Sequence, residues 1–390
     1  MLDFHYKIAG ICCFNVKDDP VICGFSKLFG KSASKSAEAY SQIISALLLV
    51  GKTLSEYLKD MLIFSDSPVV CECANSSAPL GKAAVEYDLG VIRSIAETSS
   101  AELKEQLSRR FDNDVFKALP DYERGEFNWD ADYFLDFARK HGSGIFAKYK
   151  AFTYNGELVP IEQTDPIRLH DLKNYESQRS QVVDNTLCFM NGKPAQNVLL
   201  YGDRGTGKSA TVKAVLNEFD ELRMVEVSKN NIALLPDLFR VLKSKPLRFI
   251  VTIDDLSFAE NDDRFGILKA VLEGSLSQKP GNVLIYATTN RRKIVRETAA
   301  DREISGADAI DESMSLADRF GLFVTFVKPD KRVYLDIVSK LAEDAGLNVP
   351  EEKLFAAAEQ FALRHTGRSP RTARQFVDWL TGRIALNLEY

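Results

Sequence analysis

The chain has 390 residues, enough for two or three domains that each bury their own core. Hydrophobic residues make up 45% and charged residues 27%, a composition that excludes disordered and fibrous proteins. Lys and Arg total 50 against 55 Asp and Glu, a net charge of −5, so the chain lacks the basic surplus expected of a nucleic-acid-binding protein.

Neither a secretory signal nor a membrane span is predicted. The first residues contain no basic region leading into a long apolar stretch, and the longest unbroken apolar run covers residues 46–50. We therefore expect no membrane partner and a cytoplasmic location. The six cysteines include no C-x-x-C pair, which predicts neither a disulfide framework nor a zinc site, and reduced thiols are expected.

Residues 1–155 predict a mainly helical domain. Residues 34–62 have apolar side chains at approximately helical spacing, and residues 103–116 and 130–146 repeat the pattern. The first stripe consists of Tyr40, Ile43, Ile44, Leu47, Leu48 and Leu58, and the expected core aromatics are Trp129, Tyr133, Phe134 and Phe137. Since no catalytic motif occurs in this part, we expect it to bind a partner.

A punctuated stretch at residues 155–166 predicts a hinge, after which short apolar runs alternate with helical segments. This alternation predicts an α/β domain over residues 166–328 with a five-stranded parallel sheet. The expected strands are residues 197–201, 223–227, 249–253, 283–287 and 322–326. Three helical stretches in residues 329–390 predict a small helical lid.

The sequence GDRGTGKS has the spacing of a phosphate-binding loop and lies between an apolar strand and a helix. Glycines let backbone N–H groups approach phosphate oxygens, the lysine adds a cation, and the serine offers a hydroxyl to Mg²⁺. A glycine-rich turn without function does not account for the flanking strand and helix. The predicted nucleotide-binding residues here are Gly202, Asp203, Arg204, Gly205, Thr206, Gly207, Lys208, Ser209 and Thr211.

Two aspartates follow the strand at residues 249–253, at the edge where parallel sheets bind ligands. Asp254 is predicted to hold Mg²⁺ together with Ser209, and Asp255 to accept a proton from the attacking water. The alternative is that both aspartates cap the next helix.

Two further polar residues stand next to predicted strands. Asn290 follows the fourth strand and can hold a water or a γ-phosphate oxygen. Arg319 precedes the last strand, where it can stabilise charge on a neighbouring subunit's nucleotide. The alternative for Arg319 is an ion pair with Asp318 or another acid.

The last helix is expected to begin with Ser369 as N-cap and Pro370 in the first helical position. Arg371 then lies in the first turn, where a cation opposes the helix dipole by ~0.3–1 kcal/mol. An anionic partner is therefore expected, either a phosphate of ATP or a nearby carboxylate.

In this order, the phosphate loop, Asp254-Asp255, Asn290, Arg319 and Arg371 resemble the Walker A, Walker B, sensor 1, arginine-finger and sensor 2 elements of AAA+ ATPases. The similarity covers residues 166–390. The segment 167–175 looks like the one that such proteins lay against adenine, with Leu169, Leu172 and Tyr175 as candidates. More closely, the motifs are similar to an uncharacterised bacterial AAA+ family described only as ATP-binding.

The resemblance implies a homo-oligomeric, Mg²⁺-dependent ATPase that binds ATP and ADP at subunit interfaces and remodels a protein or nucleic-acid partner. Two departures qualify this expectation. Asp255 stands where AAA+ motors usually have Glu and reaches one methylene less far, so a slowly hydrolysing, ATP-controlled binding module is the alternative. Residues 228–234 lack the aromatic, apolar and glycine sequence of protein-threading relatives, which disfavours an unfoldase. A small-molecule phosphotransferase would fit the phosphate loop but not the combination of Asn290, Arg319 and Arg371.

Overall fold

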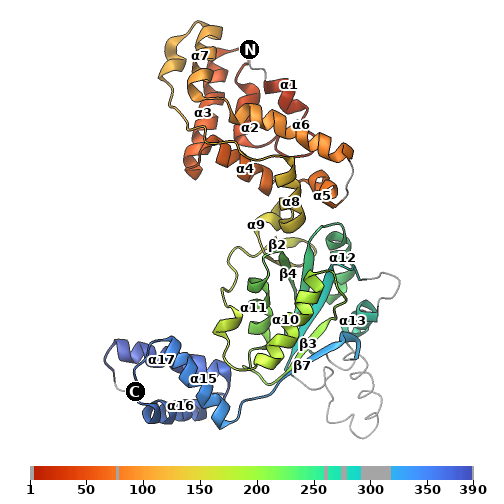
Figure 1. Ribbon diagram of the computed structural model, residues 1–390, viewed down its shortest axis with the longest axis vertical. Coiled ribbons are helices and arrows are strands. Elements are labelled where there is room, and N and C mark those ends of the chain that lie inside the picture. Colours follow the sequence, from red (N-terminus) through yellow and green to blue (C-terminus); the bar gives the residue numbers. More distant parts are fainter. Residues whose placement is uncertain (1–3, 76–78, 259–261, 274–278, 291–317, 389–390) are drawn as a thin grey trace. The chain divides into compact units, whose positions relative to one another are not determined.

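The computed structural model describes residues 4–75, 79–258, 262–273, 279–290 and 318–388 (Figure 1). The chain divides into two compact units, one formed by residues 1–149 with 245–247 and the other by the remainder. No helix within the described ranges is both long and apolar enough to cross a membrane.

The first unit is helical and has its own hydrophobic core, as the sequence predicts. Its elements are α1 (Phe4–Ala9), α2 (Pro20–Lys27), α3 (Ala33–Val50), α4 (Leu54–Phe64), α5 (Pro68–Asn75), α6 (Pro79–Ala96), α7 (Ser100–Phe111), the 3₁₀ helix η1 (Asp114–Ala118), α8 (Ala131–His141) and α9 (Ile145–Lys148). Trp129 and Phe134 are buried in this core, whereas Tyr133 is exposed.

The helical stretch expected at residues 34–62 is two helices. Gly51, at φ 63°, ends α3 and donates its N–H to the carbonyl of Leu47. Thr53 then begins α4 through a capping box with Glu56. The apolar stripe is buried as predicted except at Leu48, which is 73% exposed.

The second unit contains a seven-stranded sheet in the order β2-β1-β4-β5-β6-β3-β7. The five predicted strands are confirmed as β3 (Val198–Gly202), β4 (Leu222–Val227), β5 (Arg248–Ile253), β6 (Val283–Thr289) and β7 (Leu322–Phe326), all paired in parallel. Because β5, β6 and β3 are neighbours, the residues that follow them meet at one edge of the sheet.

The expected strand number is wrong, because two more strands precede β3. β1 (Ala151–Tyr154) pairs in parallel with β4 and antiparallel with β2 (Leu158–Pro160). The residues taken as the end of the helical domain and the start of a hinge therefore belong to the sheet. Asn155 and Gly156 lie in the turn of this hairpin, with Gly156 at φ 110°. Asn-Gly is as typical of hairpin turns as of linkers.

The sheet is accompanied by α10 (Glu176–Met190), α11 (Lys208–Glu218), α12 (Leu235–Lys243) and α13 (Asp263–Glu273), with 3₁₀ turns η2 (Leu169–Asp171), η3 (Lys229–Leu234) and η5 (Asp318–Phe320). The predicted helical lid is confirmed as α15 (Lys331–Asp344), α16 (Glu351–Arg364) and α17 (Pro370–Ala385), which share a separate core. Ser369 caps α17 by accepting the N–H of Thr372, as expected.

Candidate functional site

The phosphate loop connects β3 to α11, and its glycines are required by the backbone. Gly202 has φ 140°, and a Cβ there would lie 1.9 Å from the carbonyl oxygen of Phe326. Gly205 and Gly207 have φ of 76° and 99°, which other residues rarely adopt. Gly207 is the N-cap of α11, so the loop leads directly into a helix N-terminus, a natural anion-binding geometry.

Lys208 is the buried cation of this loop, with a side chain held by neutral oxygens. Its Nζ donates to the carbonyls of Gly202 and Asp203 at 2.9 and 2.8 Å and to Oδ1 of Asn290 at 2.9 Å. Burial lowers the pKa of Lys208 below its usual range. A bound anion would favour the charged form, because it would supply the negative charge that carbonyl oxygens lack.

The two residues predicted to hold Mg²⁺ are in direct contact. Ser209 donates from Oγ to Oδ1 of Asp254 at 2.7 Å, and the hydroxyl of Thr288 donates to the same oxygen. A hydroxyl and a carboxylate side by side next to a phosphate loop are the oxygen ligands that Mg²⁺ takes together with waters and phosphates. The residues therefore fit this ion.

Asp255 and Asn290 form the second polar pair of the site. Nδ2 of Asn290 donates to Oδ1 of Asp255 at 2.6 Å. Asp255 has φ 51°, in the left-handed region, and its N–H donates to Oγ1 of Thr288 at 3.1 Å. The next described helix begins only at Asp263, so neither aspartate caps it directly.

A cavity of about 470 Å³ collects these groups within the second unit. Its lining includes Arg204 to Thr211 of the loop and α11, and the polar residues Asp254, Asp255, Thr288 and Asn290. Gly202 and Asp203 lie behind this lining and contribute carbonyls to Lys208. The predicted phosphate, metal and water-activating residues are thus brought together.

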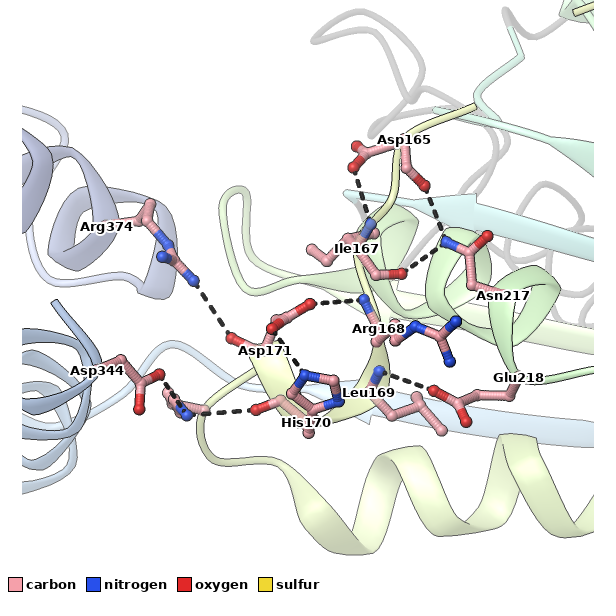
Figure 2. Close-up of polar contacts among 11 residues, drawn as sticks. Asp165, Ile167, Arg168, Leu169, His170, Asp171, Asn217, Glu218, Asp344 and Arg374 are labelled. Atoms are coloured by element: carbon pink, nitrogen blue, oxygen red, sulfur yellow. Dashed lines mark hydrogen bonds and ion pairs between the residues drawn. The ribbon is translucent and has the colours of Figure 1, made fainter. Parts of the chain in front are cut away.

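Only two of the three residues predicted to contact adenine line the apolar end of the cavity. Leu172 and Tyr175 line it, but Leu169 does not. The main-chain N–H of Leu169 instead donates to Glu218 of α11, as Figure 2 shows. Tyr175 donates its hydroxyl to the carbonyl of Val327 at 2.6 Å, and burial raises its pKa to about 12, so it stays a neutral donor.

Sequence reasoning missed the lid's apolar contribution to this cavity. Ile337 and Leu341, four residues apart on α15, line it together with Ile167 and Phe326. Their helical spacing predicts an apolar face of α15, but the pattern does not tell which part of that face packs inside the lid and which part meets the cavity.

The lid is tied to the phosphate loop and to residues 165–175. The N–H of Arg371 donates to the carbonyl of Gly205 at 3.1 Å, and Arg371 lines the cavity. Its contact with a phosphate stays a prediction. One turn later, Arg374 donates to the carbonyl of Asp171 at 3.3 Å (Figure 2). Lys173 pairs with Asp344 of α15 at 2.6 Å. The lid thus contacts both the phosphate loop and residues 165–175.

Arg319 lies apart from this cavity. It belongs to η5 and forms an ion pair with Glu273 at the end of α13. Within one chain, Arg319 therefore has an acidic partner, as the ion-pair alternative predicts. The partner is Glu273 of α13, and the side chain of Asp318 lies outside the described structure.

Comparison with known proteins gives two sequence relatives that each match part of the chain. Over 227 residues, half of this chain, it is 25% identical to the proteasome-activating nucleotidase of Methanocaldococcus jannaschii. Over 101 residues, 24% of the chain, it is 35% identical to the magnesium-chelatase 38 kDa subunit of Rhodobacter capsulatus. The matched stretches cover only 49% and 28% of the lengths of these two relatives.

Among solved structures, the chain is similar to Thermotoga maritima RuvB, described as a Holliday junction branch migration motor. The TM-score is 0.39 at 14% identity, covering 57% of this chain and 67% of that one. A RuvB variant from the same organism gives a TM-score of 0.41 at 15% identity with the same coverage.

A family defined as "Protein of unknown function (DUF815)" matches residues 146–384, which include the sheet, the phosphate loop and nearly all of the lid. The geometry of the site and the sequence relatives support the resemblance to AAA+ P-loop ATPases. The chain belongs to the DUF815 family and has an AAA+ P-loop nucleotide-binding architecture.

Proposed function

We propose that this protein binds MgATP in the 470 Å³ cavity and hydrolyses it to remodel a macromolecular partner. The observation that carries the proposal is the convergence of three polar units from neighbouring strands. Lys208 follows β3, the Ser209–Asp254 pair links α11 to the end of β5, and the Asn290–Asp255 pair links the ends of β6 and β5.

The proposed chemistry uses each of these groups once. When bound by Ser209 and Asp254, Mg²⁺ supplies positive charge that stabilises the phosphate oxygens. Lys208 donates hydrogen bonds to the phosphates in place of its present carbonyl contacts. Asp255 accepts the proton of the attacking water, and Asn290 orients the Asp255 carboxylate through the 2.6 Å hydrogen bond.

The apolar end of the cavity is the proposed adenosine site. Leu172 and Tyr175 come from one side, and Ile337 and Leu341 come from the lid. Arg371 is positioned to contact a phosphate, since its helix also donates an N–H to the phosphate loop. Closing of the lid on nucleotide would therefore bring apolar and cationic groups to opposite ends of the same ligand.

The proposed role of Arg319 requires that subunits assemble. An arginine supplied by a neighbouring subunit can stabilise the transition state of phosphoryl transfer. We propose that Arg319 exchanges Glu273 for a neighbour's nucleotide in a homo-oligomer, while the helical first unit binds the protein or nucleic-acid partner. A cytoplasmic location stays a prediction from the sequence.

A slowly hydrolysing ATP switch is the second candidate. The carboxylate of Asp255 is shorter than that of Glu and is engaged by Asn290, which favours slow activation of water. In this case ATP would close the lid and change the affinity for the partner, with little turnover.

Phosphate release measured on wild type and Asp255→Asn tests the proposal. We expect the variant to bind MgATP but to lose most of its turnover, because an amide cannot accept the proton. Wild-type release that stays at the background rate, with MgATP bound, would instead support the switch. Equal rates in wild type and variant would exclude Asp255 as the base.

A further inference from the structure

Two neighbouring thiols of the first unit lie against a buried carboxylate. Cys12 and Cys13 are in the loop between α1 and α2, and Asp88 is on α6, about 75 residues away. The Sγ atom of Cys12 is 3.8 Å from Sγ of Cys13 and 3.9 Å from Oδ1 of Asp88. One ligand atom from each of the three residues lies within 4.8 Å of the others.

Asp88 is buried without a cation. Its side chain is 0% exposed and accepts the N–H of Cys13 at 2.6 Å and the N–H of Cys12 at 3.1 and 3.2 Å. In the part of the chain that the structure describes, no Lys, Arg or His forms an ion pair with it. Buried carboxylates are normally paired with a positive charge or bound to a metal, so Asp88 is a candidate metal ligand.

Two of the three separations between the ligand atoms are close to those of a tetrahedral zinc site. With Zn–S of about 2.3 Å and Zn–O of about 2.1 Å, tetrahedral angles place two sulfurs about 3.8 Å apart and sulfur and oxygen about 3.6 Å apart. The observed 3.8 Å between the two sulfurs equals the first value, and the 3.9 Å from Sγ of Cys12 to Oδ1 of Asp88 exceeds the second by about 0.3 Å. The sulfur of Cys13 lies within 4.8 Å of a carboxylate oxygen of Asp88. The two N–H groups fix the carboxylate, as outer hydrogen bonds do around metal ligands.

Access and coordination number also fit. Cys12 is exposed, whereas Cys13 and Asp88 are buried, so the cluster opens to solvent on one side. A cation can enter there, and a water can complete a fourth position. The missing C-x-x-C pair does not exclude this site, because the third ligand comes from a distant helix.

We propose that Cys12, Cys13 and Asp88 bind one thiophilic divalent cation of the Zn²⁺ class through two thiolate sulfurs and one carboxylate oxygen. Each thiol releases its proton to solvent on binding, and no electrons are transferred. The cation would fasten the α1–α2 loop to α6 within the first unit.

Titration of the reduced, metal-free full chain with Cd²⁺ tests this proposal. Charge-transfer absorption from thiolate to Cd²⁺ reports sulfur ligands and is not produced by oxygen sites such as that of Ser209 and Asp254. We expect one Cd²⁺ per chain at this site, displaced by Zn²⁺. Affinity should fall at least about 10-fold in Cys12→Ser and in Asp88→Asn.

Cys23→Ser is the matched control, because Cys23 belongs to the same unit but donates its thiol to the carbonyl of Lys17. It should bind Cd²⁺ like wild type. Cys12 is exposed, so Cys12→Ser should fold even where Asp88→Asn does not, and circular dichroism would verify this. The absence of the absorption in wild type, or its persistence at unchanged affinity in folded Cys12→Ser, would overturn the proposal.

Discussion

Asn290 donates a 2.6 Å hydrogen bond to the carboxylate of Asp255, and its own side-chain oxygen accepts from Lys208. The residue after β6 therefore connects the proposed base with the phosphate-binding cation. Asp255 has a left-handed backbone conformation at φ 51°, and it lines the cavity. The reach and orientation of the Asp255 carboxylate would set the rate of ATP hydrolysis. A high rate fits a motor, and a low rate fits a switch.

Asp255→Glu tests whether reach limits turnover. If the shorter carboxylate slows water activation, the longer side chain should raise kcat on the order of 10-fold with little change in MgATP affinity. Steady-state phosphate release checks the rate, and calorimetry checks the affinity. A lower kcat would mean that the site is built around the hydrogen bond between Asp255 and Asn290.

Arg319→Ala tests catalysis across a subunit interface. We expect nucleotide affinity to be kept and hydrolysis to fall by ~10³ or more, the size of the contribution that a supplied arginine can make. Arg332→Ala, an exposed arginine at the start of the lid, should behave as wild type.

Mixing then separates a shared site from a structural role of Arg319. Arg319→Ala and Lys208→Ala should each be inactive alone, but mixed assemblies contain interfaces with an intact loop and an intact arginine. Some hydrolysis should therefore return. If subunits exchange and activity stays at background, the ion pair with Glu273 is the residue's role.

Gly202→Ala should destabilise the protein by more than about 2 kcal/mol, since its Cβ would lie 1.9 Å from a main-chain oxygen at φ 140°. Gly90→Ala is the matched control, because Gly90 lies inside α6 and a Cβ there meets nothing within 4 Å. The control should gain about 0.5–1 kcal/mol. Thermal unfolding of both variants gives the change in Tm relative to wild type. Equal changes in Tm would mean that β7 moves away from the added methyl group at position 202.

Lys279 provides a test of pH dependence. Burial lowers its pKa from 10.5 to about 8, so the folded state binds this proton more weakly than the unfolded state does. Wild-type stability should therefore rise as the pH increases from 8 towards 10.5, and the cost of charging Lys279 should be greatest at neutral pH.

Lys279→Met removes this cost and should stabilise the protein at pH 7 by about 1–2 kcal/mol, less than the full shift because part of the side chain meets solvent. Asn197, which accepts from Lys279, keeps its hydrogen bond from the N–H of Ile285. Urea denaturation at pH 7 and pH 10 measures the difference. A gain that is the same at both values would show that the titration of Lys279 is not its cause.

The strands β3 to β7 and the phosphate loop could be predicted, because parallel strands are short apolar runs and their polar ends meet at one edge. The hairpin of β1 and β2 could not, because Asn155-Gly156 suits a hinge as well as a turn.

The missed parts of the sites depend on tertiary packing. Residues 337 and 341 reach the cavity through the placement of the lid. Leu169 is not part of the lining, and its main-chain N–H donates to Glu218. Asp88 lies about 75 residues from the two cysteines in the sequence, so a local motif cannot predict that the three residues meet.

Calorimetric titration with MgATP tests the central claim, that the cavity around Lys208 binds this nucleotide. Wild type and Lys213→Ala, a half-exposed lysine on the same helix that pairs with Asp165, should bind one MgATP per chain with similar Kd. Lys208→Ala should weaken binding at least about 10-fold, since it removes the charged donor from the phosphates. An unchanged Kd in Lys208→Ala would contradict the account.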